Sequence, residues 1–195
     1  MPMRPTTRRS LLAIAFLMLP VAAAVGGAPP ARVTATLQSG RGEPVGEAVL
    51  SETPHGVLIT ATLHDLPPGE HGFHIHEHGR CIAPFESAGG HFNPKHARHG
   101  FRNAKGAHAG DLPNVIVPED GKAKVEIMAY GVTLAKGKPS SLLDQDGTAL
   151  VIHAGPDDYR TDPAGNSGDR LACGVVEVRT NETAAAATRP DRPTH

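Results

Sequence analysis

Short runs of β-forming residues, each followed by a turn rich in glycine, proline or aspartate, recur through the middle of the chain. The run 57–63 is closed by the turn 67–69, and the run 124–127 follows the turn 119–121. No convincing stretch places apolar residues at the 3.6-residue period of a helix. Many short strands separated by such turns are typical of a sandwich or barrel. About eight runs predict strands: 33–37, 47–51, 57–63, 73–76, 115–117, 124–127, 149–153 and 173–178.

The composition excludes several classes of protein. With 22 glycines and 18 prolines among 195 residues, a helical bundle is disfavoured. The recurring apolar runs and the balance of 19 basic against 20 acidic residues argue against disorder throughout. A formal charge of −1 gives no reason to expect a nucleic-acid partner.

Both ends of the chain differ from its middle. Three arginines precede the apolar run 11–19 and the small residues 21–27, a pattern that predicts a secretory signal peptide over residues 1–24. The apolar run is shorter than the roughly 20 residues of a membrane span, so no membrane anchor is expected. Cleavage would leave 16 basic and 20 acidic residues, a net charge of −4. Residues 181–195 predict a disordered tail, which leaves one domain over 31–180.

Three long segments interrupt the strand rhythm, over 77–111, over 128–148 and after His153. Long loops in compact domains are usually functional. Just before the first, His74 and His76 occupy alternate positions of one strand, so they share a face that points away from the core. Two imidazoles placed in this way can reach a common metal ion, although the same spacing also occurs on solvated strand faces. His153, at the end of another strand, could add a third ligand.

The first long segment supplies a second set of ligands. His91, His99 and His108 are followed by Asp111, and three imidazoles with one carboxylate form a closed shell that suits zinc. Six histidines and an aspartate imply two metal ions, unless one histidine is a bystander.

Five segments in a fixed order carry a resemblance to a known family. They read GFHIHE at 72–77, GHFNP at 90–94, HAGDLPN at 108–114, VIHA at 151–154 and RLACG at 170–174. In order and spacing the chain resembles copper/zinc superoxide dismutase from about residue 31 to 178, and the stretch 81–85 resembles its bacterial branch. The family is itself an example of a sandwich architecture.

The resemblance implies an all-β fold, an eight-stranded Greek-key barrel or sandwich with long metal-binding and electrostatic loops. It assigns copper to His74, His76, His91 and His153, and zinc to His91, His99, His108 and Asp111, with His91 as an imidazolate bridge. It makes Arg170 the guanidinium that guides the anion to copper. Asp157, with Asp158 as the alternative, becomes the outer carboxylate that joins two imidazoles. It also pairs Cys81 with Cys173 in a disulfide, which export permits.

The activity implied is dismutation of superoxide to dioxygen and hydrogen peroxide by Cu(II)/Cu(I) cycling, in an exported protein of the bacterial periplasm. The alternative is a non-catalytic relative that binds or buffers copper and zinc. Since dimer interfaces differ between branches, a homodimer does not follow from the resemblance. His71 matches a histidine that braces the backbone, whereas His78 and His96 are expected on the loop surface. Lys136 and Lys138 are candidates for further anion guidance.

Overall fold

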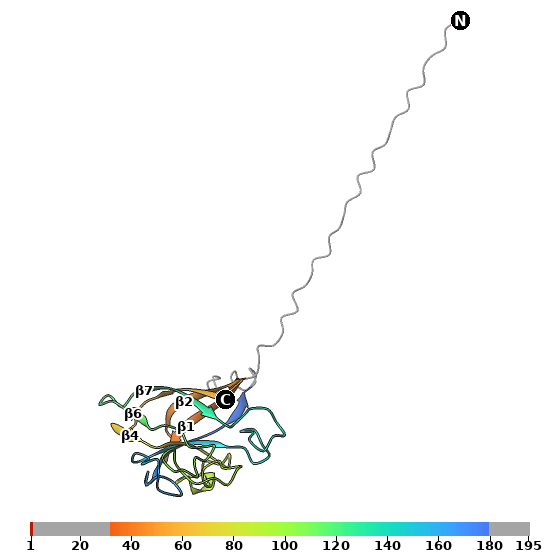
Figure 1. The fold of residues 1–195 in the computed structure, drawn as a ribbon. Helices are drawn as coiled ribbons and strands as arrows, with labels where there is room; N and C mark the ends of the chain where they lie inside the picture. The colour runs from red at the N-terminus through yellow and green to blue at the C-terminus, as the bar shows by residue number, and fades with distance from the viewer. Residues whose placement is uncertain (2–31, 180–195) are drawn as a thin grey trace, which may run out of the picture.

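The structure is a computed structural model that describes Met1 and residues 32–179 (Figure 1). Residues 2–24 of the predicted signal peptide and the whole predicted tail lie outside the described residues. No helix in the described part of the chain is long and apolar enough to cross a membrane.

Ten strands and one short 3-10 turn make up the regular structure of residues 32–179. They are β1 Arg32–Ser39, β2 Pro44–Thr53, β3 Gly56–Leu63, β4 Gly69–His71, β5 Phe73–His76, η1 Glu86–Ala88, β6 Val115–Val117, β7 Ala123–Tyr130, β8 Ala149–His153, β9 Arg170–Val175 and β10 Glu177–Arg179. All eight predicted strands are present. β4 was not predicted because it has no apolar run. The last predicted strand is split at Val176, whose N–H turns to the Thr148 carbonyl.

The strands form one curled antiparallel sheet in the order β5-β8-β9-β1-β2-β3-β7, with β10 paired to the beginning of β1. A second, two-stranded sheet of β4 and β6 completes the fold. β4 runs into β5 with only Gly72 between them, and β6 contacts β7. The chain therefore crosses from β3 at one side of the large sheet to β5 at its opposite edge. The predicted all-β fold with Greek-key crossovers is confirmed.

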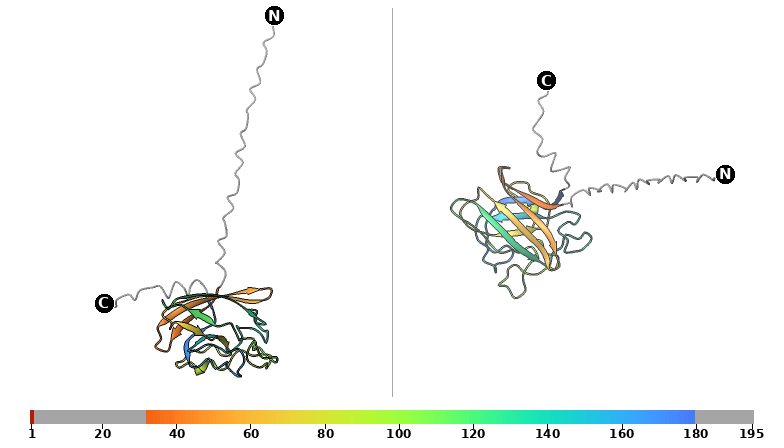
Figure 2. Two further views of the ribbon diagram at one scale, coloured as in Figure 1. Left: turned by 60° about the vertical axis from the view of Figure 1, so that its left-hand side comes forward. Right: turned by 90° about the horizontal axis from the view of Figure 1, so that it is seen from above.

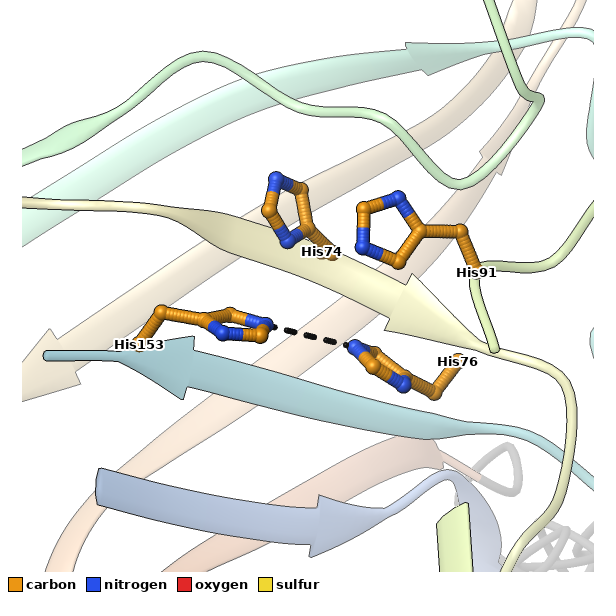
Figure 3. Close-up of side chains that lie close together, drawn as sticks. All are labelled: His74, His76, His91 and His153. Atoms are coloured by element: carbon orange, nitrogen blue, oxygen red, sulfur yellow. Dashed lines mark hydrogen bonds between the residues drawn. The ribbon is translucent and has the colours of Figure 1, made fainter. Parts of the chain in front are cut away.

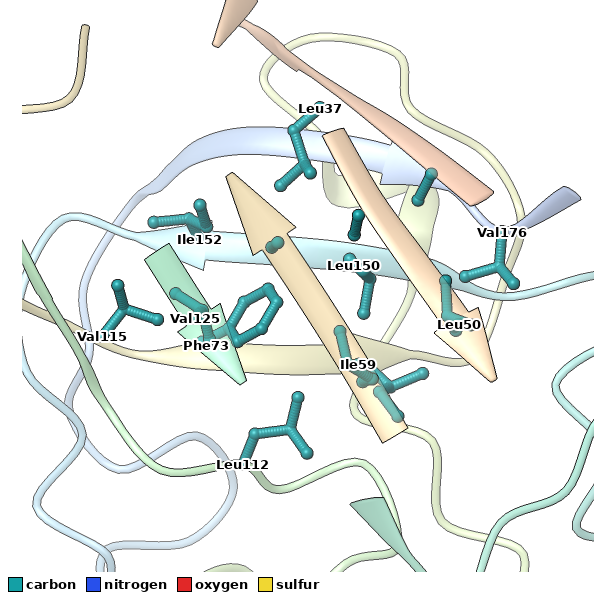
Figure 4. Close-up of a cluster of buried hydrophobic side chains, with 14 of the residues drawn as sticks. Leu37, Leu50, Ile59, Phe73, Leu112, Val115, Val125, Leu150, Ile152 and Val176 are labelled. Carbon is teal, nitrogen blue, oxygen red and sulfur yellow. The ribbon is translucent and has the colours of Figure 1, made fainter. Parts of the chain in front are cut away.

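The hydrophobic core lies between β1–β3 on one side and β5, β8 and β9 on the other (Figure 4). Leu37, Ile59, Phe73, Leu150 and Ile152 are all fully buried. Each such side chain contributes about 1.5–3 kcal/mol through removal of apolar surface from water. This rigid sheet is the frame on which the loops are mounted.

Three long loops, over residues 77–114, 131–148 and 154–169, connect strands of this frame. The second begins later than predicted because β7 continues to Tyr130. The first and third gather on the side of the molecule away from β1, β2 and β7 (Figures 1 and 2). His71 ties this side to the frame, since its two ring nitrogens lie 2.8 Å from the carbonyl oxygens of Pro67 and His153.

Candidate metal centre

His74 and His76 lie on the face of β5 that is turned away from the apolar core. Their two apolar neighbours on the strand belong to that core, as strand alternation predicts. The histidines are nevertheless buried, with 0% and 1% of their surface exposed. Loop residues cover this face, because backbone bridges join His74 to Asp111 and His76 to His91.

His153, at the end of β8, and His91, on the first long loop, complete what we call the four-histidine cluster: His74, His76, His91 and His153 (Figure 3). One ring nitrogen from each residue lies within 4.8 Å of the others. The rings of His74 and His91 are closest, with centroids 4.0 Å apart. Side chains from two strands and one loop therefore converge on a single point.

Backbone carbonyls determine which ring nitrogen His76 and His153 present at that point. His76 Nδ1 lies 2.9 Å from the Gly89 carbonyl oxygen, and His153 Nδ1 lies 3.1 Å from that of Gly168. Each Nδ1 therefore carries the proton of a neutral ring, and each Nε2 presents a bare lone pair. The two Nε2 atoms are 3.4 Å apart, as the dashed line in Figure 3 marks. Two lone pairs thus face each other.

The second group, which we call the aspartate cluster, consists of His91, His99, His108 and Asp111. The Nδ1 atoms of the three histidines lie 2.8, 3.1 and 3.2 Å from Asp111 Oδ1, and no side chain in the cluster is more than 8% exposed. Asp111 Oδ2 accepts hydrogen bonds from the backbone N–H groups of Gly100 and His108. The backbone of the loop therefore fixes the Asp111 carboxylate among the three imidazoles.

A single carboxylate, Asp157, connects the two clusters. Its Oδ2 lies 2.9 Å from His74 Nε2, and its Oδ1 lies 2.9 Å from His99 Nε2. Asn114 holds the backbone of Asp157 through two hydrogen bonds, of 2.9 and 3.0 Å. Among the described residues, the alternative residue Asp158 bonds only within its own loop. Asp157 therefore occupies the place that the resemblance gave to the outer carboxylate.

Arg170, the first residue of β9, lies beside the four-histidine cluster. Its Nη1 donates to the Phe85 carbonyl at 2.6 Å and its Nη2 to the Gly89 carbonyl at 2.7 Å. Because the Gly89 oxygen also accepts from His76 Nδ1, one backbone carbonyl positions both side chains.

The predicted disulfide between Cys81 and Cys173 is present. Cys81 belongs to the first long loop, and Cys173 is buried in β9, three residues after Arg170. The bond packs with a small apolar cluster that includes Phe85 and Ala88. It therefore fastens to β9 the loop segment whose carbonyls hold Arg170.

A cavity of about 380 Å³ opens onto the four-histidine cluster. Its lining includes His76, Glu77, Gly90, His91, Asn93, His96, His108, His153, Pro163, Ala164 and Arg170. His96, expected on the loop surface, is exposed but also lines this cavity. Lys136 and Lys138, the candidates for anion guidance, are not among the residues that line it.

Burial keeps the four-histidine cluster uncharged. It lowers the pKa of His74 to about 3 and that of His153 to about 4. The pKa values of His76 and His91 are also lowered, mainly by burial. Neutral imidazole is the form that binds metal ions, so His74, His76 and His153 need lose no proton to bind one.

The aspartate cluster instead favours charged side chains. Burial alone would raise the pKa of Asp111, but the adjacent imidazoles of His108, His91 and His99 hold it far below its usual range. Burial likewise opposes protonation of His99, but hydrogen bonds to Asp111 and Asp157 outweigh it and raise its pKa to about 9. Without a metal ion, this cluster therefore retains a proton that a cation would replace.

Three contributions to the site were not predicted from the sequence. Asn114 lies in a segment that carried the resemblance, but no role was assigned to it. The Gly89 carbonyl belongs to the backbone, so its role cannot be predicted from the residue type. Asp162 accepts a hydrogen bond from the backbone N–H of His99 at 2.7 Å, yet in the sequence it resembles any acidic loop residue.

Comparison with known proteins places this architecture among its relatives. The family model described as copper/zinc superoxide dismutase (SODC) matches residues 45–176. Superoxide dismutase [Cu-Zn] 1 of Aquifex aeolicus is 53% identical over 139 residues, which cover 70% of this chain and 82% of that protein. A SOD-like protein from Bacillus subtilis superposes with a TM-score of 0.71 at 44% identity, covering 74% of this chain and 97% of that one. The Cu/Zn superoxide dismutase from Brucella abortus gives a TM-score of 0.61 at 31% identity, with 75% and 99% covered.

The matched segment runs from β2 through β9 and contains both clusters, Asp157, Arg170 and the disulfide. Relatives named as copper-zinc enzymes share about half of its residues. By sequence, fold and the side chains gathered on its loops, this chain belongs to the copper/zinc superoxide dismutase family of oxidoreductases.

Proposed function

We propose that the four-histidine cluster binds copper and the aspartate cluster binds zinc, with His91 giving one ring nitrogen to each, in an enzyme that dismutates superoxide. The pair of facing Nε2 lone pairs on His76 and His153, 3.4 Å apart, carries this proposal. Two lone pairs repel each other, and a cation between them removes the repulsion. Among the described residues, buried His74 Nδ1 and His91 Nε2 also have no hydrogen-bond partner. Such unsatisfied atoms are rare in folded proteins unless a ligand is missing.

The chemistry of the two donor sets supports the division of metals. Imidazole nitrogens suit copper, and the cavity leaves one side of the four-histidine cluster open to a small ligand. Three imidazoles with one carboxylate make a closed four-ligand set, which is typical of structural zinc. Zinc has no redox chemistry, so its role here is to hold the loop and His91 in place.

Copper, when bound, supplies the one-electron oxidation and reduction needed to convert two superoxide anions and two protons to dioxygen and hydrogen peroxide. Arg170 attracts and orients the anion. Two of its five N–H groups are taken by backbone carbonyls, which leaves three to donate. His91 Nε2, which has no hydrogen-bond partner among the described residues, would hold one of the two protons that peroxide formation requires whenever this nitrogen is not bound to copper.

Local charge, not overall charge, supports attraction of the substrate. The mature chain would carry a net charge of −4, which repels an anion. Among the described residues that line the cavity, Arg170 is the one with a guanidinium or ammonium group. Glu77 also lines this cavity, but Arg170 lies beside the histidines, and the low-dielectric walls of a cleft concentrate the field of a charge within it.

We also propose cleavage of a signal peptide over residues 1–24 and residence of the 31–180 domain in the bacterial periplasm. The basic and then apolar amino terminus, the disulfide and the bacterial relatives support this. Mass spectrometry of a periplasmic extract should find a mature chain that starts between about residues 22 and 31. Recovery of the protein with Met1 intact from the cytoplasm would contradict it.

The metal assignment is tested by metal analysis together with a dismutation assay on two variants. His153→Ala should lose copper and activity yet keep one zinc, because His153 belongs only to the four-histidine cluster. Asp111→Ala should weaken zinc first, because Asp111 belongs only to the other cluster. His55→Ala, on the surface, is the control and should change neither metal. Loss of zinc from His153→Ala as readily as copper would refute the division. Metallated wild type without turnover would favour the non-catalytic alternative.

A further inference from the structure

A carboxylate that belongs to neither cluster holds the main chain at one of the proposed zinc ligands. Asp162 Oδ1 accepts a hydrogen bond from the backbone N–H of His99 at 2.7 Å, and Asp162 Oδ2 lies 2.6 Å from Arg98 Nη1. Its side chain is one-third exposed, whereas that of Arg98 is largely exposed. Hydrogen bonds to an ionised acceptor are about twice as strong as neutral ones. The contact to His99 is therefore the strong one of the pair, because exposed ion pairs contribute little.

Asp162 and Asp157 both form hydrogen bonds with His99, but at different atoms. Asp157 holds the imidazole of His99 at Nε2, and Asp162, five residues later on the same loop, holds its backbone. The loop 154–169 thus fixes both the position and the ring orientation of one ligand. A ligand held at two points loses little freedom when a metal binds.

The hydrogen bond between Asp162 and the His99 backbone also affects the two residues that follow Asp162. Pro163 and Ala164 line the cavity that opens onto the four-histidine cluster. The cavity wall is therefore continuous in sequence with the residue that holds His99.

We propose that Asp162 is a positioning residue that fixes the main chain of His99 for zinc and thereby joins the zinc loop to the cavity wall at Pro163 and Ala164. This inference rests on the proposed assignment of zinc to the aspartate cluster. It gives Asp162 no contact with metal or substrate, since it acts through the backbone of His99. Zinc binding should therefore order the cavity wall, and should do so only while Asp162 makes this contact.

The test measures zinc affinity by competition with a chelator in mature protein stripped of metal, and hydrogen exchange of residues 162–166 with and without zinc. Asp162→Ala should weaken zinc by about 10-fold or more, the usual result of removing a group that supports a metal ligand. Copper affinity should stay within about twofold, because no copper-side histidine contacts Asp162. The protection that zinc gives to residues 162–166 should disappear.

Three further variants separate positioning from general support of the loop. Asp162→Asn keeps an oxygen that can accept from the His99 N–H, so its zinc affinity should stay within about threefold of wild type. Arg98→Ala removes only the exposed ion pair and should have a similarly small effect. Asp158→Ala removes a carboxylate whose bonds to the described residues all lie within the same loop, and it should leave zinc affinity near that of wild type.

The outcomes distinguish this inference from the assignment beneath it. The proposed metal site would be overturned if the wild-type protein bound no zinc. It would also be overturned if the His108→Ala variant, which lacks a proposed ligand, bound zinc as tightly as wild type. A wild type that binds zinc while Asp162→Ala binds it equally well would overturn only the role of Asp162. So would an Asn variant as weak as the Ala variant, or an Asp158→Ala variant as weak as Asp162→Ala. If Asp162→Ala fails to fold, a tenfold loss of zinc affinity in Asp162→Asn or Arg98→Ala would still refute the role.

Discussion

Replacing Gly165 with alanine should loosen both metals without touching a ligand. Gly165 has a φ of +65°, and a Cβ placed on it would lie 1.8 Å from Asp157 Oδ1 and 2.8 Å from His99 Nε2. Since Cβ atoms essentially never approach a heavy atom within 3.0 Å, the Asp157 carboxylate must move away. Asp157 is the side chain that holds His74 and His99, so the added methyl group acts on both clusters.

The size of the effect follows from the geometry. The carboxylate must retreat by about 1.2 Å in a close-packed interior, which would stretch its 2.9 Å hydrogen bonds toward about 4 Å, beyond bonding range. Loss of an outer partner of a ligating histidine costs about 10–100-fold in metal affinity, or about 1.4–2.8 kcal/mol. The left-handed backbone adds about 1–2 kcal/mol of strain in alanine.

Chelator competition for copper and zinc, together with thermal unfolding of the metal-free protein, separates these contributions. Gly137→Ala is the matched control, because Gly137 has a φ of +73° and no atom within 4 Å of a Cβ placed on it. It should carry the backbone strain alone and keep wild-type metal affinity. If Gly165→Ala bound both metals within about twofold of wild type, Asp157 would not support the ligands as argued here.

Three further perturbations have defined outcomes. Replacing Cys81 and Cys173 with alanine should lower the free energy of unfolding by up to about 4–5 kcal/mol, from a separation of 92 residues; unchanged denaturant midpoints would contradict this. Arg170→Gln should keep both metals but lower turnover and flatten its salt dependence, since attraction is screened over about 8 Å at physiological ionic strength; full turnover in the metallated variant would remove the guiding role. Metal-free protein should be most stable near pH 6.5. As the pH rises from 6.5 to 9, the stability that protonated His99 gives the folded state is lost, because its pKa is raised to about 9. As the pH falls below 6.5, the unfolded chain binds a proton at His74 that the folded chain does not bind, because burial lowers the pKa of His74 to about 3, and stability falls again. Stability that rose steadily from pH 6.5 to pH 9 would contradict this.

The strands could be predicted from sequence because their signal is local. Alternation of apolar residues over 57–63 is a property of the run itself, and β3 follows it closely. β4 carries only one buried residue in three, so it exists through pairing with β6, which no local pattern shows. The end of β7 also extends beyond the predicted run 124–127, where β3 pairs with it up to Tyr130.

The ligand side chains were also predictable, because each residue type and its spacing carry chemistry. The parts that support them were less so. His74 and His76 were expected on an open face, but their burial depends on a loop whose path the sequence does not encode locally. Asp162 and the Gly89 carbonyl gain their roles only when residues more than 60 and 80 positions away fold against them.

The sharing of Asp157 between the two clusters has a thermodynamic consequence. If zinc on one side orders this carboxylate, copper on the other side meets a partly prepared site and binds more tightly. Linkage then requires that copper improve the affinity for zinc by the same factor, whatever that factor is. The order in which the metals arrive therefore alters the path of assembly and the species seen along it, while the fully loaded protein has the same free energy by either path.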